Sequence, residues 1–268
     1  MAIFRTPSLR EASYAFIGSL AAADLTIGLV MNPIYAAIVG QSITDSDHPL
    51  NVAEHYLWIH TVITTTFNLA GMSVEKYIAV IYPLHYPMIV TSRRTIIAVI
   101  AIWCLSMLSM CSRAFITKAQ DIETLWIAHS VIAIAAPLCV IIVCHFHILK
   151  AISKQQRRIN LQPNVLTLEQ NLRSQARSKA AWTMIIVISL TVLFWTPNIV
   201  MTVLNFFAEG ECAKEHIFRV WVWCASVAFI SSAINPFVYS IRMRDFRIAI
   251  RKICSLPNNN TENVQVIA

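Results

Sequence analysis

Charged residues are scarce in this 268-residue chain, and their scarcity limits the classes of protein to which it can belong. Asp, Glu, Lys and Arg make up 13% of the residues, against about 25% in soluble domains, and apolar residues make up 57%. The mean hydropathy is +0.60. One aqueous core cannot bury this much apolar surface, so lipid must surround much of the chain. A soluble enzyme, a disordered chain and a disulfide scaffold are therefore poor starting hypotheses.

Glycine and metal-type cysteine pairs are also scarce. Five glycines and the lack of a short repeated unit exclude collagen-like and low-complexity architectures. The seven cysteines include no CxxC pair of the kind that binds metals, and most lie in apolar runs. No cleavable signal is expected, because Met1–Arg10 is short and mixed and contains Pro7.

Six apolar stretches are long enough to cross a bilayer. A hydrocarbon core of about 30 Å needs about 20 residues of helix, and a helix satisfies its own backbone hydrogen bonds in lipid. A β-barrel would need short alternating strands, which these long runs are not. The sequence therefore predicts an all-α membrane bundle with the spans Ser13–Val39, Tyr56–Ile81, Thr95–Met110, Leu125–Leu149, Ala181–Phe207 and Phe218–Ile241.

The Lys and Arg residues predict the orientation of these spans. The N-terminus, His85–Arg94, Lys150–Lys179 and the tail after Arg242 hold sixteen of them, and the opposite side of the bundle holds four. Under the positive-inside rule both termini are cytosolic. Gln41–His55, Arg113–Thr124 and Ala208–Ile217 then face outside. The net charge of +7 thus reflects membrane topology rather than nucleic-acid binding.

Two segments flank the last span on its cytosolic side. In Arg244–Cys254, Phe246, Ile250 and Ile253 share one helical face among Arg and Lys residues, which predicts a short amphipathic helix on the inner leaflet. The polar tail 255–268 is expected to be disordered. Between the fourth and fifth spans, Ser153–Ser178 is a basic cytosolic loop whose ends are expected to extend the neighbouring spans as helices.

Asp24 lies in the middle of the first predicted span. A charge there is costly in lipid and must face the bundle interior or a wet cavity. Its candidate partners are Asn235, Ser231, Ser232 and Thr65. Their carboxylate, amide and hydroxyl oxygens are suited to a hard monovalent cation. The alternative is a structural aspartate that is protonated or hydrogen-bonded.

Four prolines and one charged tripeptide also interrupt the spans. Pro33, Pro137, Pro197 and Pro236 each remove a helix hydrogen bond and are candidate pivots, although proline is common in membrane helices. Glu75-Lys76-Tyr77 lies where the second span meets the cytosol, and an ordinary interfacial cluster with snorkelling side chains would explain it as well.

These features together resemble the rhodopsin-like (class A) G protein-coupled receptors. Six motifs in the family's order, each on the matching span, carry the resemblance over most of the chain. They are Ser19-Leu20-Ala21-Ala22-Ala23-Asp24-Leu25, Glu75-Lys76-Tyr77 followed by Pro83-Leu84-His85-Tyr86, Trp103, Pro137, Phe194-Trp195-Thr196-Pro197 and Asn235-Pro236-Phe237-Val238-Tyr239. The resemblance implies a seven-helix receptor bundle of which helices 2–7 and a short helix 8 are present, over residues 1–254.

The register of these motifs explains the count of six. Phe4–Arg10 resembles the family's first intracellular loop, so the chain is expected to start where helix one has just ended. A truncated gene model, an alternative start and a true six-helix product all remain open.

The resemblance implies a signalling mechanism and a location. An extracellular ligand would favour a state in which the inner end of the sixth-helix equivalent, Ala181–Phe207, swings outward and admits the C-terminal helix of a Gα subunit. Trp195 would repack beneath the ligand, Tyr239 would move inward, and Asp24, Thr65, Ser231, Ser232 and Asn235 would hold a sodium ion that favours the closed state. The chain would then be a multi-pass plasma membrane receptor with no other cofactor, in contact with lipid, and not an enzyme.

Departures from the family pattern bear on the ligand. Trp58 replaces the aspartate of amine receptors, and Phe229 replaces the retinal-binding lysine of opsins, so neither kind of ligand is expected. Gln41–His55 is acidic, which would favour a cationic peptide or small molecule. An interfacial aromatic belt explains the aromatic members of the candidate pocket about equally well. The candidate pocket residues are Tyr35, Glu54, Trp58, Trp126, His129, Asn198, Thr202, Trp221 and Ala225.

Other departures bear on coupling. Lys76 replaces the family's arginine at the position that contacts the G protein, which keeps the charge but loses the planar fork. A non-signalling fragment that dimerises with intact receptors is therefore a competing hypothesis, and a six-helix transporter is a weaker one because no internal repeat is visible. Cys254, at the end of the amphipathic segment, is a candidate palmitoylation site or else a free thiol.

Overall fold

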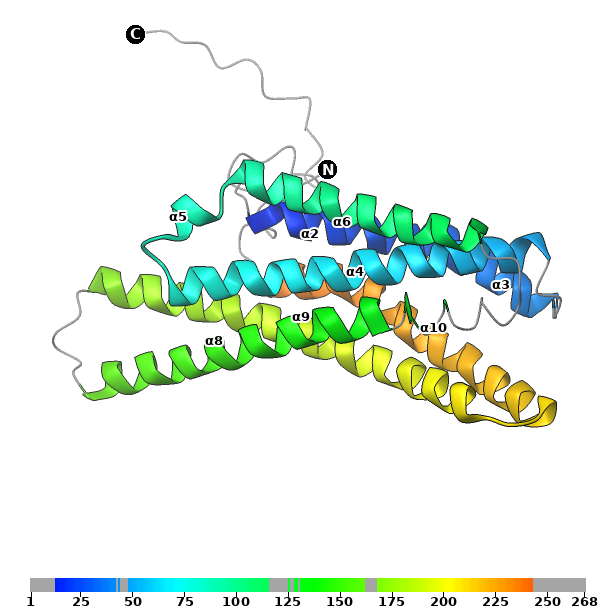
Figure 1. The fold of residues 1–268 in the computed structure, drawn as a ribbon. Helices are drawn as coiled ribbons and strands as arrows, with labels where there is room; N and C mark the ends of the chain where they lie inside the picture. Colours follow the sequence, from blue (N-terminus) through cyan, green and yellow to red (C-terminus); the bar gives the residue numbers. More distant parts are fainter. Residues whose placement is uncertain are drawn as a thin grey trace, which may run out of the picture.

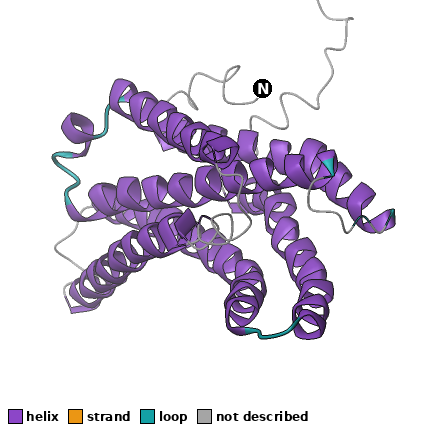
Figure 2. Cartoon of the chain, turned by 45° about the vertical axis from the view of Figure 1, so that its right-hand side comes forward, coloured by secondary structure: helices purple, strands orange, loops and turns teal. Residues whose placement is uncertain are grey.

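The computed structural model describes residues 13–41, 43, 48–115, 125, 128–129, 131–161 and 168–242. Within these ranges all regular secondary structure is helical, and no strand occurs (Figure 2). The long helices lie side by side in one bundle (Figure 1). The predicted all-α bundle is thus confirmed. The predicted amphipathic segment Arg244–Cys254 and the tail 255–268 lie outside the described residues.

The first predicted span is present, but it is not one continuous α-helix. It consists of α2 (Ser13–Thr26), a π-helical turn η2 (Ile27–Met31) and α3 (Asn32–Gly40). The amide of Asn32 donates to the carbonyl of Ile27, five residues back. Pro33 follows directly. Its ring would clash with the preceding turn of a regular α-helix, which favours the wider π-helical turn there. The same combination recurs where η4 (Val131–Ala135) precedes Pro137 near the start of α8 (Ala136–Leu161).

Helix α4 (Pro49–Ile81) begins earlier than the predicted span, so the second half of Gln41–His55, which the sequence predicts to face outside, is helical. The reason is a local helix start that a search for apolar runs misses. The ring of His48 accepts a hydrogen bond of 3.2 Å from the Leu50 amide, and Pro49 occupies the first turn. Glu54 is consequently a helical residue rather than a loop residue.

The remaining elements are α5 (Tyr86–Ile89), α6 (Ser92–Ser112), the 3-10 turn η3 (Arg113–Phe115), α9 (Leu168–Phe207) and α10 (Glu211–Arg242). Helices α6, α9 and α10 begin earlier than the predicted spans, and α8 and α9 run beyond the apolar core into the basic segment, as expected from the sequence. Helix α5 was not predicted, and α10 begins within Ala208–Ile217, which the sequence predicts to face outside.

Four helical stretches within the described part of the chain are long and apolar enough to cross a membrane: Ala15–Gly40, Ser92–Ser112, Ile132–Lys154 and Ile188–Asn205. The sequence predicted six spans, and α4 is less apolar than this measure requires. The position of α4 explains its polarity, since it runs through the middle of the bundle against α2, α6 and α8 (Figure 1). Its buried Thr61, Thr64 and Asn68 therefore face protein rather than lipid.

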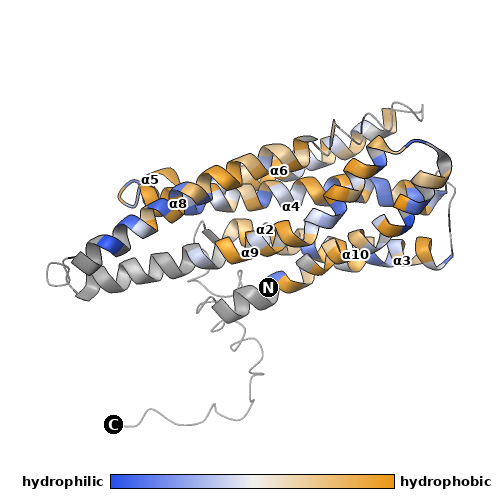
Figure 3. Ribbon diagram, turned by 90° about the horizontal axis from the view of Figure 1, so that it is seen from below, coloured by the Kyte–Doolittle hydropathy of each residue, from blue (hydrophilic) through white to orange (hydrophobic). Residues whose placement is uncertain are grey.

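Lipid-facing and internal surfaces differ accordingly. Helix α6 is apolar along most of its length, and Ile97, Ile100 and Leu108 are more than half exposed (Figure 3). An apolar core joins α2 and α4 to α8 and α9 through Phe16, Ile17, Met72, Ile141 and Ile188. A second and larger core joins α3, α4, α9 and α10 around several aromatic side chains. The candidate site residues are distributed around this second core and at the C-terminal end of α4.

Candidate functional site

The two helices farthest apart in the sequence meet at Asp24. The side-chain amide of Asn235 in α10 donates a 3.0 Å hydrogen bond to Asp24 Oδ2 in α2. The hydroxyl of Ser232, one turn earlier in α10, bonds to the same carboxylate. Asp24 Oδ1 has no hydrogen-bond partner among the described residues. The carboxylate is therefore held on one side and retains an acceptor on the other.

Thr65 supplies a second buried oxygen in this half of the bundle. It lies in α4, is 3% exposed, and its hydroxyl has no hydrogen-bond partner among the described residues. Buried polar atoms without partners are rare and call for an explanation such as an ion or a water. An orphan carboxylate oxygen and an orphan hydroxyl have the donor chemistry that a sodium ion requires. Ser231 lies in α10, and its side chain is not described.

Several predicted ligand residues contact one another directly. Trp58 of α4 packs against Trp195 of α9, Trp221 of α10 and Phe229 of α10, with ring centroids 6.0, 5.3 and 5.7 Å apart. Tyr35 of α3 meets Trp221 at 6.3 Å and Phe229 at 5.6 Å. These five side chains form what we call the aromatic cluster. The aromatic cluster joins α3, α4, α9 and α10. Because Trp58 and Trp195 are in contact, a displacement of Trp58 would directly displace Trp195.

The other predicted ligand residues surround the aromatic cluster to differing extents. Glu54, Asn198 and Ala225 are buried. The Thr202 hydroxyl bonds to the Asn198 carbonyl at 3.0 Å, and the His129 ring lies 2.9 Å from the Leu125 carbonyl, so both are engaged locally. Trp126 lies outside the described residues.

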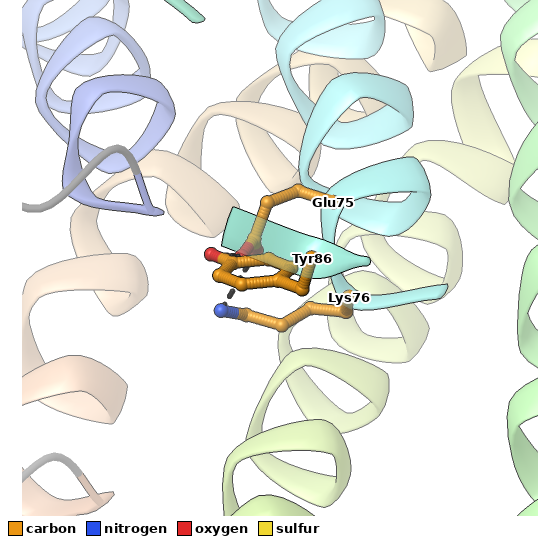
Figure 4. A network of polar contacts seen from close by, with 3 residues as sticks. All are labelled: Glu75, Lys76 and Tyr86. Atoms are coloured by element: carbon orange, nitrogen blue, oxygen red, sulfur yellow. Dashed lines mark hydrogen bonds and ion pairs between the residues drawn. The ribbon is translucent and has the colours of Figure 1, made fainter. Parts of the chain in front are cut away.

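A second polar group lies at the C-terminal end of α4. Lys76 Nζ is 2.8 Å from Glu75 Oε2, and the Tyr86 hydroxyl of α5 donates a 2.5 Å hydrogen bond to Glu75 Oε1 (Figure 4). Glu75 is 4% exposed. We call these three side chains the Glu75 latch. Because both oxygens of the carboxylate are engaged, Lys76 is drawn toward its neighbour in the chain.

Helix α5 owes its position to α6. Arg94 in the first turn of α6 donates hydrogen bonds of 2.9 and 3.0 Å to the carbonyls of Met88 and Ile89. These carbonyls end α5 and have no partner within so short a helix, so the guanidinium fixes its last turn. Arg94 thereby helps to hold Tyr86 over Glu75. The sequence places Tyr86 in a family motif but gives no indication of its role.

Tyr77 faces away from the Glu75 latch. Its ring packs edge-on against His147 of α8 at 5.9 Å and against Tyr82 at 6.1 Å. It also covers a small apolar group formed by Ile148 and Ile152 of α8 with Ile185 of α9. Tyr77 therefore connects α4, α8 and α9 at this end of the bundle.

The family model described as 7 transmembrane receptor (rhodopsin family) matches residues 1–239. The chain belongs to the rhodopsin family of seven-transmembrane receptors. It is therefore a G protein-coupled receptor and a multi-pass plasma membrane protein, and its family is one of receptors rather than enzymes.

Known relatives of this rhodopsin-family receptor bind different ligands. The rat histamine H2 receptor is 26% identical over 287 residues, covering 99% of this chain and 77% of that receptor. The human histamine H2 receptor is 26% identical, over 96% of this chain and 75% of the length of that receptor. The cannabinoid receptor type 1B of Takifugu rubripes is 24% identical, over 94% of this chain and 58% of the length of that receptor. At this level of identity the relatives agree with the family and do not identify the ligand.

A solved structure agrees with the fold of the receptor. Squid rhodopsin matches with a TM-score of 0.77 and 20% identity, over 99% of this chain and 85% of that chain. This likeness shows the fold alone.

Some predicted site residues of the receptor are placed only in part. Pro197 lies within α9. Pro236 and Tyr239 belong to α10, and their side chains are not described. Cys254 lies outside the described residues. No group of three His, Cys, Asp or Glu side chains suited to a metal occurs in the described part of the receptor.

Proposed function

We propose that this receptor converts binding of an extracellular ligand at the aromatic cluster into opening of the cytosolic end of α9, which admits the C-terminal helix of a Gα subunit. The observation that carries the proposal is the course of α9. This one helix contributes Trp195 to the aromatic cluster and Ile185 and Ile188 to the apolar groups near the cytosolic end. A ligand that displaces Trp58 would act on α9 through Trp195.

The packing of α9 supports an outward swing of its inner end. Helix α9 packs along α10 over much of its length and touches α8 only slightly. Pro197 interrupts the backbone hydrogen bonds of α9 just outward of Trp195, so the helix can bend at that level. A helix held firmly on one side and weakly on the other is free to rotate away from the weak contact.

The Glu75 latch would oppose opening. In the latched state Lys76 stays beside Glu75, whereas the groove for a Gα helix needs a cation that reaches the Gα subunit. Ligand binding would shift the population from the latched to the open state, because the open state binds both ligand and G protein better.

A sodium ion at Asp24, Asn235, Ser232 and Thr65 would favour the closed state. The orphan oxygens of Asp24 and Thr65 supply acceptors, and a cation there would tie α2, α4 and α10 together. Ser231, at the same level of α10, would be a further ligand. Opening the bundle would separate these ligands and release the ion.

We further propose that the ligand is neither a biogenic amine held in the usual way nor retinal. Trp58 and Phe229 replace the two side chains that those ligands require, and both are packed in the aromatic cluster. The rim of the outer end is acidic, so a cationic peptide or small molecule is favoured.

The test is nucleotide exchange on purified Gα subunits by the receptor in lipid nanodiscs. Lys76→Arg is expected to raise ligand-independent exchange, because the guanidinium can bond to Glu75 and to a Gα carbonyl together. Unchanged exchange in Lys76→Arg would contradict a coupling role for this residue.

A second function is favoured by Lys76 itself. A receptor whose family arginine is replaced by lysine could act by dimerising with intact receptors instead of coupling. In that case no variant would support exchange, and co-expression would lower the surface level of a full-length receptor.

A further inference from the structure

Glu54 is a buried carboxylate with an unused oxygen. It lies in the second turn of α4, and its side chain is 8% exposed. Oε1 has no hydrogen-bond partner among the described residues. Oε2 lies 3.9 Å from His55 Nε2, which is too long for a hydrogen bond. A buried carboxylate left in this state is costly unless a cation or donor comes to it.

The aromatic cluster begins one helical turn from this carboxylate. Trp58 follows Glu54 by one helical turn and therefore lies on the same face of α4, about 6 Å deeper. Trp58 contacts Trp221, which in turn meets Tyr35. A buried carboxylate one helical turn from a cluster of Tyr and Trp rings is a setting in which organic cations bind, through the charge and through the rings together.

Two buried side chains of α9 carry unsatisfied donors in the same region. Trp195 Nε1 and Asn198 Nδ2 are buried and have no hydrogen-bond partner among the described residues. They are three residues apart on α9 and so share a face. Trp195 packs against Trp58, one turn deeper than Glu54, and Asn198 lies about one turn outward of Trp195. The site therefore offers an acceptor near its outer end and a donor, Trp195 Nε1, about one turn further in. A ligand that satisfies both carries a cation at one end and a hydrogen-bond acceptor at the other.

We propose that Glu54 binds a guanidinium group of the extracellular ligand. This inference rests on the proposed function, since it names the chemistry of the ligand that the aromatic cluster takes. Guanidinium fits better than a simple ammonium because it is planar, stacks on Trp and Tyr rings and presents paired donors to a carboxylate. Amine receptors of the family have their anion at the position of Trp58. Glu54 places an anion one helical turn outward of that position.

The experiment measures binding of matched probes to the whole receptor in nanodiscs by ligand-observed NMR. One pair is 2-phenylethylguanidinium and its neutral isostere 2-phenylethylurea. The other pair is acetyl-Phe-Arg-amide and acetyl-Phe-citrulline-amide, which places the same two groups on a peptide. Each guanidinium probe that fits is expected to bind about tenfold more tightly than its urea, the factor typical of a charge-assisted hydrogen bond. The pair with the larger ratio identifies a small-molecule or a peptide source.

Three variants make the result specific. Glu54→Gln is expected to bring both ratios close to one, and Glu54→Asp is expected to keep the preference at lower affinity, which excludes misfolding as the cause. Glu209→Gln removes an exposed carboxylate at the same end of the bundle and is expected to change nothing. Equal binding of guanidinium and urea in the unmodified receptor, or a preference that survives in Glu54→Gln, would overturn the proposal. Because no G protein is present, failure of coupling would not affect this readout.

Discussion

Asn235 donates a hydrogen bond of 3.0 Å to Asp24 across 211 positions of sequence. The bond joins the first and last described helices of the bundle at their polar centre. One oxygen of Asp24 is engaged by it, and the other has no hydrogen-bond partner among the described residues. The pair therefore fixes α2 against α10 and still leaves an acceptor for a cation.

Asp24→Asn is expected to remove the effect of sodium on stability. Sodium that binds the folded receptor stabilises it by mass action, so the unmodified receptor should melt at a higher temperature in NaCl than in N-methylglucamine chloride. The variant lacks the charge and should melt at the same temperature in both salts. Thermal unfolding in nanodiscs measures this difference, and a sodium effect that persists in Asp24→Asn would reject the ion site.

Tyr86→Phe is expected to raise ligand-independent nucleotide exchange on Gα. The change deletes only the hydroxyl that bonds Glu75, and a loss of about 1 kcal/mol from the closed state corresponds to about a fivefold larger open population. Tyr56→Phe removes the same group at the opposite end of α4 and is the control. If Tyr86→Phe and Tyr56→Phe exchange nucleotide at equal rates, the Glu75 latch does not restrain the receptor.

The Asp24 contact and the Tyr86 contact differ in how far the sequence could predict them. A carboxylate inside an apolar span needs a polar partner in the bundle, and the polar face of Asn235 and Ser232 was a visible candidate. Tyr86 lies after Pro83 in a loop with no periodic pattern. Its contact with Glu75 depends on the position of α5, which Arg94 holds by hydrogen bonds to backbone carbonyls. A hydropathy pattern does not predict such bonds.

Gly71→Ala is expected to destabilise the receptor by about 1–2 kcal/mol, because overpacking of a core outweighs the gain in helix propensity. A Cβ at this position would lie 2.5 Å from Phe16 Cε1 and 2.8 Å from its Cζ, within the core shared by α2 and α4. Thermal unfolding in nanodiscs measures the loss. Gly28→Ala is the control, since a Cβ there meets nothing within 4 Å. A loss that is as large in a Phe16→Leu background would show that the ring is not the cause.

Helix type and approximate position followed from apolar runs, but helix ends and close packing did not. The start of α4 depends on the His48 ring and Pro49, and the π-helical turn at Ile27–Met31 depends on Pro33. The bond of 2.9 Å from Trp103 to Ser19 joins α6 to α2 and arises only after the helices have packed. The candidate ligand residues were chosen by motif register, and only the structure brings Tyr35, Trp58, Trp195 and Trp221 into contact.

The most direct test of the account is the distance between the cytosolic parts of α6 and α9. Spin labels at Ile97→Cys and Trp182→Cys, both exposed positions, would be introduced after replacement of the native cysteines, and pulsed electron resonance would give the distance distribution. Addition of nucleotide-free heterotrimeric G protein is expected to add a longer distance, and Tyr86→Phe to populate it before the G protein is added. A distribution that stays unchanged while the G protein is bound would contradict the outward movement of α9.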